Sequence, residues 1–497
     1  MGSIYRWANH VRIWLGEASP DSAMAMELVN DCARIESPQH IIKRITREDS
    51  SAQALITLLR RPYWSRMWVF QEIVLSKRAT VHCGAFQAEW SAFKRLDRLS
   101  AHTQDWAKLQ GRETWVLELR KALFGIAQFC ITKKQARLVT NILQPTRRLQ
   151  SKDPRDKIFA LLGVCDRDSF LSPDYTMSTR DLYIASTRNL IEQNQDLSIL
   201  LTSGLWSPEN GENIDLPSWV PDFRGASGID IQYMAASYLN YFNAARGTHF
   251  SLPLQAKIFA PCHDILETEG ILLNPVSKNV ALGKGEAGRR NVLEEFAVQQ
   301  TDAKVEQPTL EALFQAMIFE NATFHGGTNT EERTRKRERL FRLALGFTHE
   351  AFMLRAEDSC GSALAITESI VGELCPLSEQ SLIEEYLRLQ REDPEQLYWL
   401  REEFKLRTEE STDSSLTTIF STTDGYIGRS LTQIKRGDLV AILAGCRLPL
   451  ILRVQEDSGC YFVVCPCYVG GVMFGELEKR FRSNSPDGLE IRKISLV

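Results

Sequence analysis

The sequence of 497 residues contains no long uninterrupted apolar run. A membrane-spanning helix needs about 18 such residues in succession, and no segment approaches that length. The opening residues, MGSIYRWANHVRIWLGE, have no apolar core of the kind that a secretory signal carries. They also miss the myristoylation pattern, because Arg6 stands where Ser or Thr is required. We therefore expect a soluble, cytoplasmic protein with no membrane span.

An excess of charge of one sign is also missing. The 59 Lys and Arg residues nearly balance the 63 Asp and Glu residues, for a net charge of −4. No global basic field is present to attract nucleic acid, so we expect none as a partner. The 11 cysteines are odd in number and lack the spacing of a disulfide framework, which indicates a reducing compartment. Hydrophobic residues make up 43% and charged residues 25%, as in ordinary globular proteins.

Standard catalytic and metal signatures are absent too. The sequence has no Walker A loop, HExxH, GxSxG or CxxC pattern. One GxGxxG match, at 283–288, is flanked by charged residues, and we interpret it as a surface loop rather than a dinucleotide site. Cys465 and Cys467, with Cys446 and Cys460 near them in sequence, match no familiar zinc module and are read as buried thiols. We predict no metal and no bound cofactor.

Local signals predict several elements. An amphipathic helix follows Asp21, and a short β-branched strand ends at Gly84. A compact buried helix has Asp153 as its N-cap, and a longer amphipathic helix begins near Ser178. A further strand is expected at 197–201.

Composition divides the chain into four parts. Segment 1–84 mixes helices with a strand, and 85–281 is mainly helical. Segment 282–411 is highly charged and helical, with acidic and basic residues interleaved, which is typical of solvated helix faces. Segment 412–497 consists of apolar strands separated by turns and predicts a small antiparallel barrel or sandwich. The fold class expected for the whole is mixed α+β.

The most aromatic segment is RPYWSRMWVFQEIV, at 61–74. It predicts a buried helix with Pro62 at its first position. Glu72 then lies on the same helical face as Trp64 and Trp68, so its carboxylate faces apolar rings. A carboxylate in such a place costs free energy unless it is paired or useful.

Two explanations of Glu72 remain open from the residues. In the first, the carboxylate is structural and forms an ion pair or backbone hydrogen bond, with Arg61 and Arg66 as candidate partners. In the second, Glu72 is a catalytic or ligand-binding group with a perturbed pKa, as desolvated carboxylates often are in active sites.

The order of motifs resembles a known family. RPYWSRMWVFQEIVLS, preceded by IYRWANHVRIWLGE and followed by DPRDKIFALLGV, resembles the fungal heterokaryon-incompatibility (HET) domain family. There, a WLG segment, an R-x-W-x-x-QE helix and a DPRDK-type helix follow one another. GYIGRSLTQIKRGDLVAILAGCRLPLILR and YVGGVMFGE resemble the carboxy-terminal module of the same family.

The resemblance is incomplete at the front. The family's ALSY-WG and WIDA-CINQ motifs do not occur in this sequence. The resemblance therefore implies that 1–84 is the C-terminal part of a HET domain, either because the start was placed too far downstream or because this is a shortened paralogue. It also implies that parallel strands beside 79–84 are missing, which would leave an open sheet edge and exposed apolar helix faces.

The resemblance implies a role in fungal non-self recognition linked to programmed cell death. Its partners would be proteins of the incompatibility pathway, and self-association stays open. HET domains are also remotely similar to TIR domains, some of which cleave NAD with a glutamate. An alternative is thus a TIR-like NAD glycohydrolase with NAD as substrate and Glu72 as catalytic residue. Arg66, Trp68 and Gln71 would then help to bind the substrate.

A third alternative is a degenerate, non-catalytic interaction protein whose carboxy-terminal β module binds a partner. The residues leave open whether the chain is an enzyme. They also leave open which partner is recognised and what triggers the response.

Overall fold

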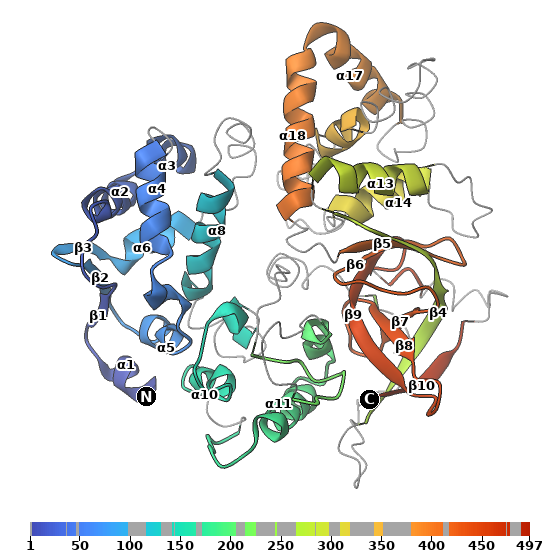
Figure 1. Ribbon diagram of the computed structural model, residues 1–497, viewed down its shortest axis with the longest axis horizontal. Coiled ribbons are helices and arrows are strands. Elements are labelled where there is room, and N and C mark those ends of the chain that lie inside the picture. The colour runs from blue at the N-terminus through green and yellow to red at the C-terminus, as the bar shows by residue number, and fades with distance from the viewer. Residues whose placement is uncertain are drawn as a thin grey trace. The chain divides into compact units, whose positions relative to one another are not determined.

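The computed structural model describes residues 2–35, 37–45, 49–97, 116–130, 142–143, 145–165, 171–204, 214–224, 244–245, 265–283, 285–297, 309–318, 342–350, 379–410, 417–473, 475–477 and 489–497. The chain divides into two compact units. The first is Met1–Leu182 with Phe223–Gly225, and the second is Tyr183–Asp222 with Ala226–Val497. The mixed α+β class is confirmed (Figure 1).

The first unit contains a three-stranded sheet in the order β1-β2-β3. Strand β1 (Val11–Trp14) runs parallel to β2 (Ala79–Cys83), and β3 (Phe86–Glu89) runs antiparallel to β2. The predicted strand before Gly84 is therefore confirmed. The predicted open edge beside it is wrong, because the WLG segment itself supplies a parallel neighbour. The free edge of the described sheet lies at β1 instead.

Five helices of the first unit are α2 (Ser22–Arg34), α3 (Pro38–Ile45), α4 (Asp49–Leu59), α6 (Trp90–Asp97) and α8 (Val116–Ala127). Helix α2 begins directly after Asp21, as predicted, and buries Ala25, Val29 and Cys32 at helical spacing. It packs against α4, α6 and β3 (Figure 1). These contacts cover one side of the sheet.

The aromatic segment does not form the single helix predicted for it. A 3₁₀ turn, η1 (Pro62–Ser65), is followed by an extended Arg66 and then by the short helix α5 (Val69–Val74). The break occurs because the backbone pairs with Gln150: the Met67 amide donates to the Gln150 carbonyl over 2.8 Å. A tertiary hydrogen bond has replaced a helical one.

The second unit is built on a seven-stranded sheet. Its strands are β4 (Leu266–Ala281), β5 (Thr418–Thr422), β6 (Ile427–Ser430), β7 (Leu439–Leu443), β8 (Leu450–Val454), β9 (Tyr461–Val469) and β10 (Ile491–Leu496). They follow the order β10-β4-β5-β6-β9-β8-β7, and β4 also pairs with β7. The sheet therefore closes into a barrel, antiparallel except for one β9–β10 pair.

The long strand β4 was not anticipated. Its residues fall in the part that composition marks as mainly helical, yet it pairs antiparallel with β5, β7 and β10. Pro275 lies at an irregularity of the β4–β7 ladder. Proline has no amide hydrogen to donate, and a bulge or irregularity is where a strand tolerates this loss. The barrel thus depends on a strand supplied from far upstream of the β tail.

Helices accompany the barrel in the second unit. They are α13 (Gly285–Ala297), α14 (Thr309–Ile318), α17 (Glu379–Glu392) and α18 (Pro394–Glu410). Helix α14 packs against β6, where the buried Arg429 donates to the Met317 carbonyl over 2.8 Å. Fully buried Glu350 joins Arg289 of α13 to Arg401 of α18. These polar contacts fix the helical layer to itself and to the barrel.

The two elements predicted near Ser178 and at 197–201 have different outcomes. Helix α11 (Thr179–Asn194) starts directly after Ser178, whose hydroxyl accepts the Asp181 amide hydrogen over 3.1 Å, so the predicted helix start is confirmed. The strand predicted at 197–201 is wrong. The residues form a 3₁₀ turn, η7 (Ser198–Thr202), because the Asp196 side chain accepts the Ser198 amide hydrogen and starts a turn.

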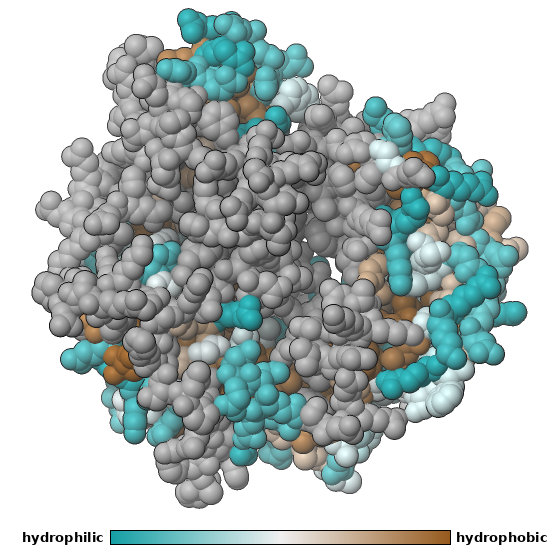
Figure 2. All heavy atoms as spheres, turned by 180° about the vertical axis from the view of Figure 1, so that it is seen from behind, coloured by the Kyte–Doolittle hydropathy of each residue, from teal (hydrophilic) through white to brown (hydrophobic). Residues whose placement is uncertain are grey.

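Most placed surface atoms are hydrophilic when the molecule is seen from behind, and hydrophobic atoms reach the surface in small areas (Figure 2). Exposed large hydrophobic side chains of the first unit are Ile4, Trp7, Trp14, Met24, Phe86 and Tyr175. Within the described ranges, no helix is long and apolar enough to cross a bilayer.

The barrel contains a buried carboxylate that holds a turn and two strands together. Asp438, 2% exposed, precedes β7 and accepts two hydrogen bonds from Arg453 of β8, at 2.8 and 2.9 Å. Its other partner is the Lys435 amide at 2.7 Å. Asp438 therefore satisfies three donors at once.

We expect Asp438→Ala to lower the stability of the second unit by about 2–4 kcal/mol. The substitution leaves the Arg453 guanidinium and the Lys435 amide without their hydrogen-bond acceptor. Urea denaturation followed by tryptophan fluorescence measures the shift in midpoint. The matched control is Asp457→Ala, an exposed aspartate in the β8–β9 hairpin, which should change stability by less than about 0.5 kcal/mol. Equal effects of the two substitutions would contradict the role given to Asp438.

Candidate functional site

Helix α5 lies at the meeting point of the three segments that carry the motifs. It packs against α1 (Gly2–Trp7) and α10 (Asp156–Leu162). Gln71 and Glu72 lie in the middle of this helix, and Trp68 is its N-cap residue. The side chains of these three residues each bond to a different part of the surroundings.

Glu72 is half-buried and accepts a hydrogen bond from the Tyr63 hydroxyl over 2.8 Å. Tyr5 of α1 also lies close enough to hydrogen-bond and interact electrostatically with the same carboxylate. Burial raises the pKa of Tyr63, and the neighbouring Glu72 carboxylate raises it further. The pKa of Tyr5 is raised for the same two reasons. Glu72 thus bridges α5 to η1 and α1.

The arginines expected as partners of Glu72 take different positions. Arg61 donates to the carbonyls of Leu15 and Glu17, at 3.0 and 2.7 Å, and so holds the turn after β1. Arg66 is exposed and affects the two tyrosines only through its charge. Two tyrosine hydroxyls therefore do what an ion pair was expected to do.

Trp68 connects α5 to the DPRDK segment. Its indole nitrogen donates to Asp156 Oδ2 over 3.0 Å, and the Tyr175 hydroxyl donates to Asp156 Oδ1 over 2.7 Å. Burial raises the pKa of Tyr175 to about 12, helped by Asp156. The Asp156 carboxylate, in the first turn of α10, is shared between an indole and a phenol.

Gln71 anchors the other end of α10. Its amide nitrogen donates to the Ala160 carbonyl over 2.5 Å, and the residue is only 2% exposed. A side chain at Gly163 would meet the Gln71 amide at 2.7 Å, and one at Gly2 would meet the Gly163 carbonyl oxygen at 2.7 Å. Glycine at 2 and 163 therefore allows α1, α5 and the end of α10 to approach closely.

The DPRDK segment is ordered by its own charges. The Asp153 carboxylate accepts the Arg155 amide hydrogen at 2.9 Å and its guanidinium at 2.8 Å. The helix begins at Asp156, three residues later than the predicted N-cap, because Asp153 closes a turn with Arg155 instead. Buried Lys157 donates to the carbonyl of Arg147 over 2.9 Å.

The structure thus brings Trp68, Gln71 and Glu72 into one cluster of contacts, with Arg66 exposed beside it. Sequence reasoning missed the tyrosines of this cluster, Tyr5, Tyr63 and Tyr175. A signal was present, since Tyr63 stands in the aromatic RPYW segment beside Glu72 and Tyr5 in the IYRW segment that carries the family resemblance.

Other candidate chemistry finds little support in the part of the chain that the structure describes. There, no group of three or more potential ligands is placed to hold a metal ion. Cys446, Cys465 and Cys467 are free buried thiols, and burial raises their pKa values. The glycines at 283–288 lead from β4 into α13, but the strands beside β4 are antiparallel, unlike those of a dinucleotide-binding unit.

The Tyr63–Glu72 hydrogen bond predicts a pH dependence. The pKa of Tyr63 is raised in the folded protein, so the neutral phenol stabilises the fold below about pH 10 and this contribution is lost as pH rises further. At neutral pH, Tyr63→Phe should cost about 1–2 kcal/mol. Above about pH 10, the wild type should lose stability more steeply than this variant.

Thermal unfolding at a series of pH values measures both effects. Tyr398→Phe is the matched control, because Tyr398 is 45% exposed and lies on α18. Its stability should follow the wild type at every pH. If Tyr63→Phe also followed the wild type above pH ~10, the hydrogen bond would not be the stabilising contact described here.

Comparisons with known proteins agree with this arrangement. Residues 1–72 match the family model "Heterokaryon incompatibility protein (HET)", and residues 408–485 match the "Het-6 beta-barrel domain". Heterokaryon incompatibility protein 6, OR allele, of Neurospora crassa is 23% identical over 304 residues, which are 45% of this chain and 42% of that protein. The matching region thus spans less than half the length of this relative. No solved structure matches the chain.

The two family matches fall on the two regions whose motifs were singled out. The HET match ends at Glu72 of helix α5. The barrel match covers strands β5 to β9. In these two regions the chain is similar to domains of the heterokaryon-incompatibility family.

Proposed function

We propose that this protein acts in fungal non-self recognition, where contact between incompatible partners leads to programmed cell death. In this proposal the first unit works by associating with proteins of the incompatibility pathway in the cytoplasm rather than by chemistry. The support comes from the two family matches and from the relative named for heterokaryon incompatibility.

One observation favours association over catalysis. The Trp68 indole, the Gln71 amide nitrogen and the Glu72 carboxylate all bond to neighbouring segments of the same unit. A catalytic carboxylate must reach the reacting atoms of a substrate, whereas that of Glu72 accepts a hydrogen bond from Tyr63. The cluster is therefore better suited to hold a surface in shape than to act on a ligand.

An alternative is NAD cleavage by a TIR-like site. The parallel β1–β2 pair with helices packed against the sheet favours a TIR-like domain, although β3 is antiparallel. Loss of nicotinamide passes through an oxocarbenium-like state, which the Glu72 carboxylate would stabilise electrostatically. Arg66, Trp68 and Gln71 would bind the substrate, and the Tyr63 hydroxyl would have to release Glu72 first. The remaining alternative is a non-catalytic protein whose barrel binds a partner.

Inducible expression in a filamentous fungus separates these functions. Growth and cellular NAD are followed for the wild type, Glu72→Gln and Glu72→Ala. Glu89→Gln is the matched control, because Glu89 is an acidic residue on β3 of the same unit and forms an ion pair with Arg78. We expect growth arrest with unchanged NAD, and we expect the arrest to persist in Glu72→Gln because glutamine still accepts the Tyr63 hydrogen bond.

The other outcomes point elsewhere. A fall in NAD that both Glu72 variants abolish and Glu89→Gln does not would establish the enzymatic alternative. Normal growth with normal NAD in every strain, at verified protein levels, would leave the non-catalytic barrel protein as the function to pursue.

A further inference from the structure

The outer edge of β1 carries backbone groups that no described strand pairs with. In the parallel ladder with β2, the Val11 amide donates to the Arg78 carbonyl at 2.9 Å and the Leu15 amide to the His82 carbonyl at 2.9 Å. Because backbone groups along a strand alternate in direction, those of Arg12 and Trp14 point away from β2. Among the described strands, none pairs with that side of β1.

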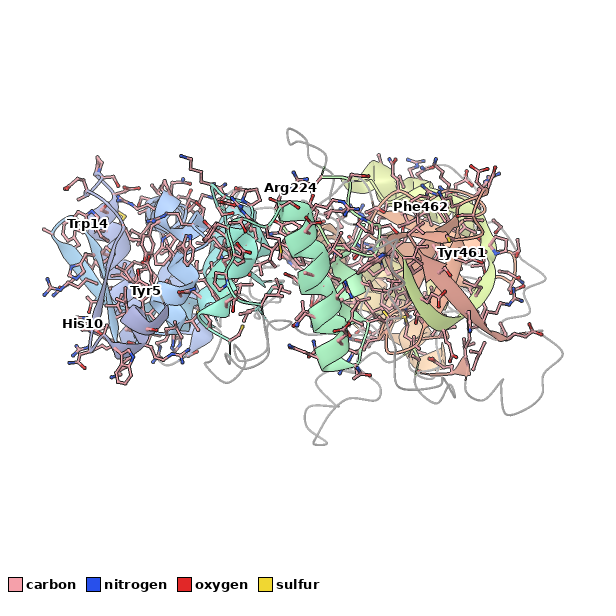
Figure 3. All side chains as sticks on the ribbon, turned by 90° about the horizontal axis from the view of Figure 1, so that it is seen from below. Tyr5, His10, Trp14, Arg224, Tyr461 and Phe462 are labelled. Carbon is pink, nitrogen blue, oxygen red and sulfur yellow. The ribbon has the colours of Figure 1, made fainter. Side chains whose placement is uncertain are left out.

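Among the described residues, the side chains of Arg12 and Trp14 at this edge form no ion pair or side-chain hydrogen bond. Arg12 and Trp14 lie on the face of the sheet opposite to buried Val11 and Ile13, and the Trp14 indole is 50% exposed. Figure 3 shows Trp14 toward the outer part of this unit. Across the described residues, no carboxylate forms an ion pair with Arg12, since the nearby Glu89 bonds Arg78 and Thr80.

Free strand edges are a known liability. Proteins blunt them with short strands, charged side chains, proline, a bulge or a covering segment, and four-residue β1 uses the first two through its length and Arg12. Strand β1 contains no proline, and its register with β2 runs without a shift. An unpaired sheet edge can receive a further strand through main-chain hydrogen bonds, with side chains such as the exposed Trp14 adding to the contact.

We propose that β1 pairs antiparallel with β1 of a second copy of this chain, about a two-fold axis at Ile13. This pairing joins the two three-stranded sheets into one of six strands. It places Arg12 of each copy opposite Trp14 of the other, with the backbone groups of both residues hydrogen-bonded across the interface.

The residue pattern favours a second copy over an unrelated strand. A two-fold interface must be self-complementary, so that a residue and its opposite number exchange roles across the axis. Arg12 and Trp14 are two positions apart and share a face, so each guanidinium meets the indole of the other copy in a cation–π contact. Both unengaged side chains of the edge gain a partner from this one arrangement.

Analytical ultracentrifugation of the full chain over a wide concentration range tests the proposal. The wild type should form a dimer. Arg12→Glu should raise the dimer Kd by about tenfold or more, because it removes both cation–π contacts. Arg12→Pro should abolish the dimer without unfolding the monomer, because the lost amide hydrogen points away from β2.

The pairing register is tested by a charge exchange. The double variant Arg12→Glu with Trp14→Lys places opposite charges across the axis and should restore the dimer that Arg12→Glu loses. Trp7→Ser is the matched control, because this second exposed indole, 78% exposed, lies on α1 and not on the strand. Circular dichroism verifies that each variant is folded.

Three results would overturn the proposal. The first is a wild type that stays monomeric at every concentration. The second is a dimer that survives Arg12→Pro and Arg12→Glu, or that Trp7→Ser weakens equally. The third is failure of the double variant to regain the dimer, since the Arg12–Trp14 register would then be wrong.

Discussion

The packing of the first unit depends on how the polar side-chain groups of its aromatic segment find hydrogen-bond partners. An indole N–H, an amide and a carboxylate within five residues all carry hydrogen-bonding groups that are costly to bury alone. Trp68 and Gln71 bond to the first and last turns of α10, and Glu72 bonds to η1 and α1. Three segments far apart in sequence are positioned by one six-residue helix.

The same contacts explain why the helix is so short. A continuous helix through 62–74 would place Trp64 and Trp68 on one face. Instead the break at Arg66 sends Trp64 into the core, where it stacks on Trp90 at 5.9 Å and bonds the Leu58 carbonyl, and leaves Trp68 facing α10. Two tryptophans four residues apart therefore contact different parts of the unit.

Sequence patterns correctly predicted the local elements that have clear capping residues, turn residues or periodicity. The helix after Asp21, the strand before Gly84 and the helix after Ser178 each carry a cap, a turn residue or a clear period. The two failures have different causes: a tertiary hydrogen bond to Gln150 broke the aromatic helix, whereas a local one from the Ser198 amide to the Asp196 side chain turned an apolar run into a 3₁₀ turn. The cluster around Glu72 was recognised as a place where polar groups meet aromatic ones, but its tyrosine partners lie where periodicity carries no information.

The barrel has a consequence for synthesis of the chain. Strand β4 pairs with β10 from Leu266↔Leu496 to Ile271↔Ile491, so two strands more than 200 residues apart must meet before the β4–β10 seam exists. Contacts of such long range form slowly, because the intervening loop loses entropy first. During synthesis β4 emerges from the ribosome more than 200 residues before β10, so it needs protection from other strands until its partner is made.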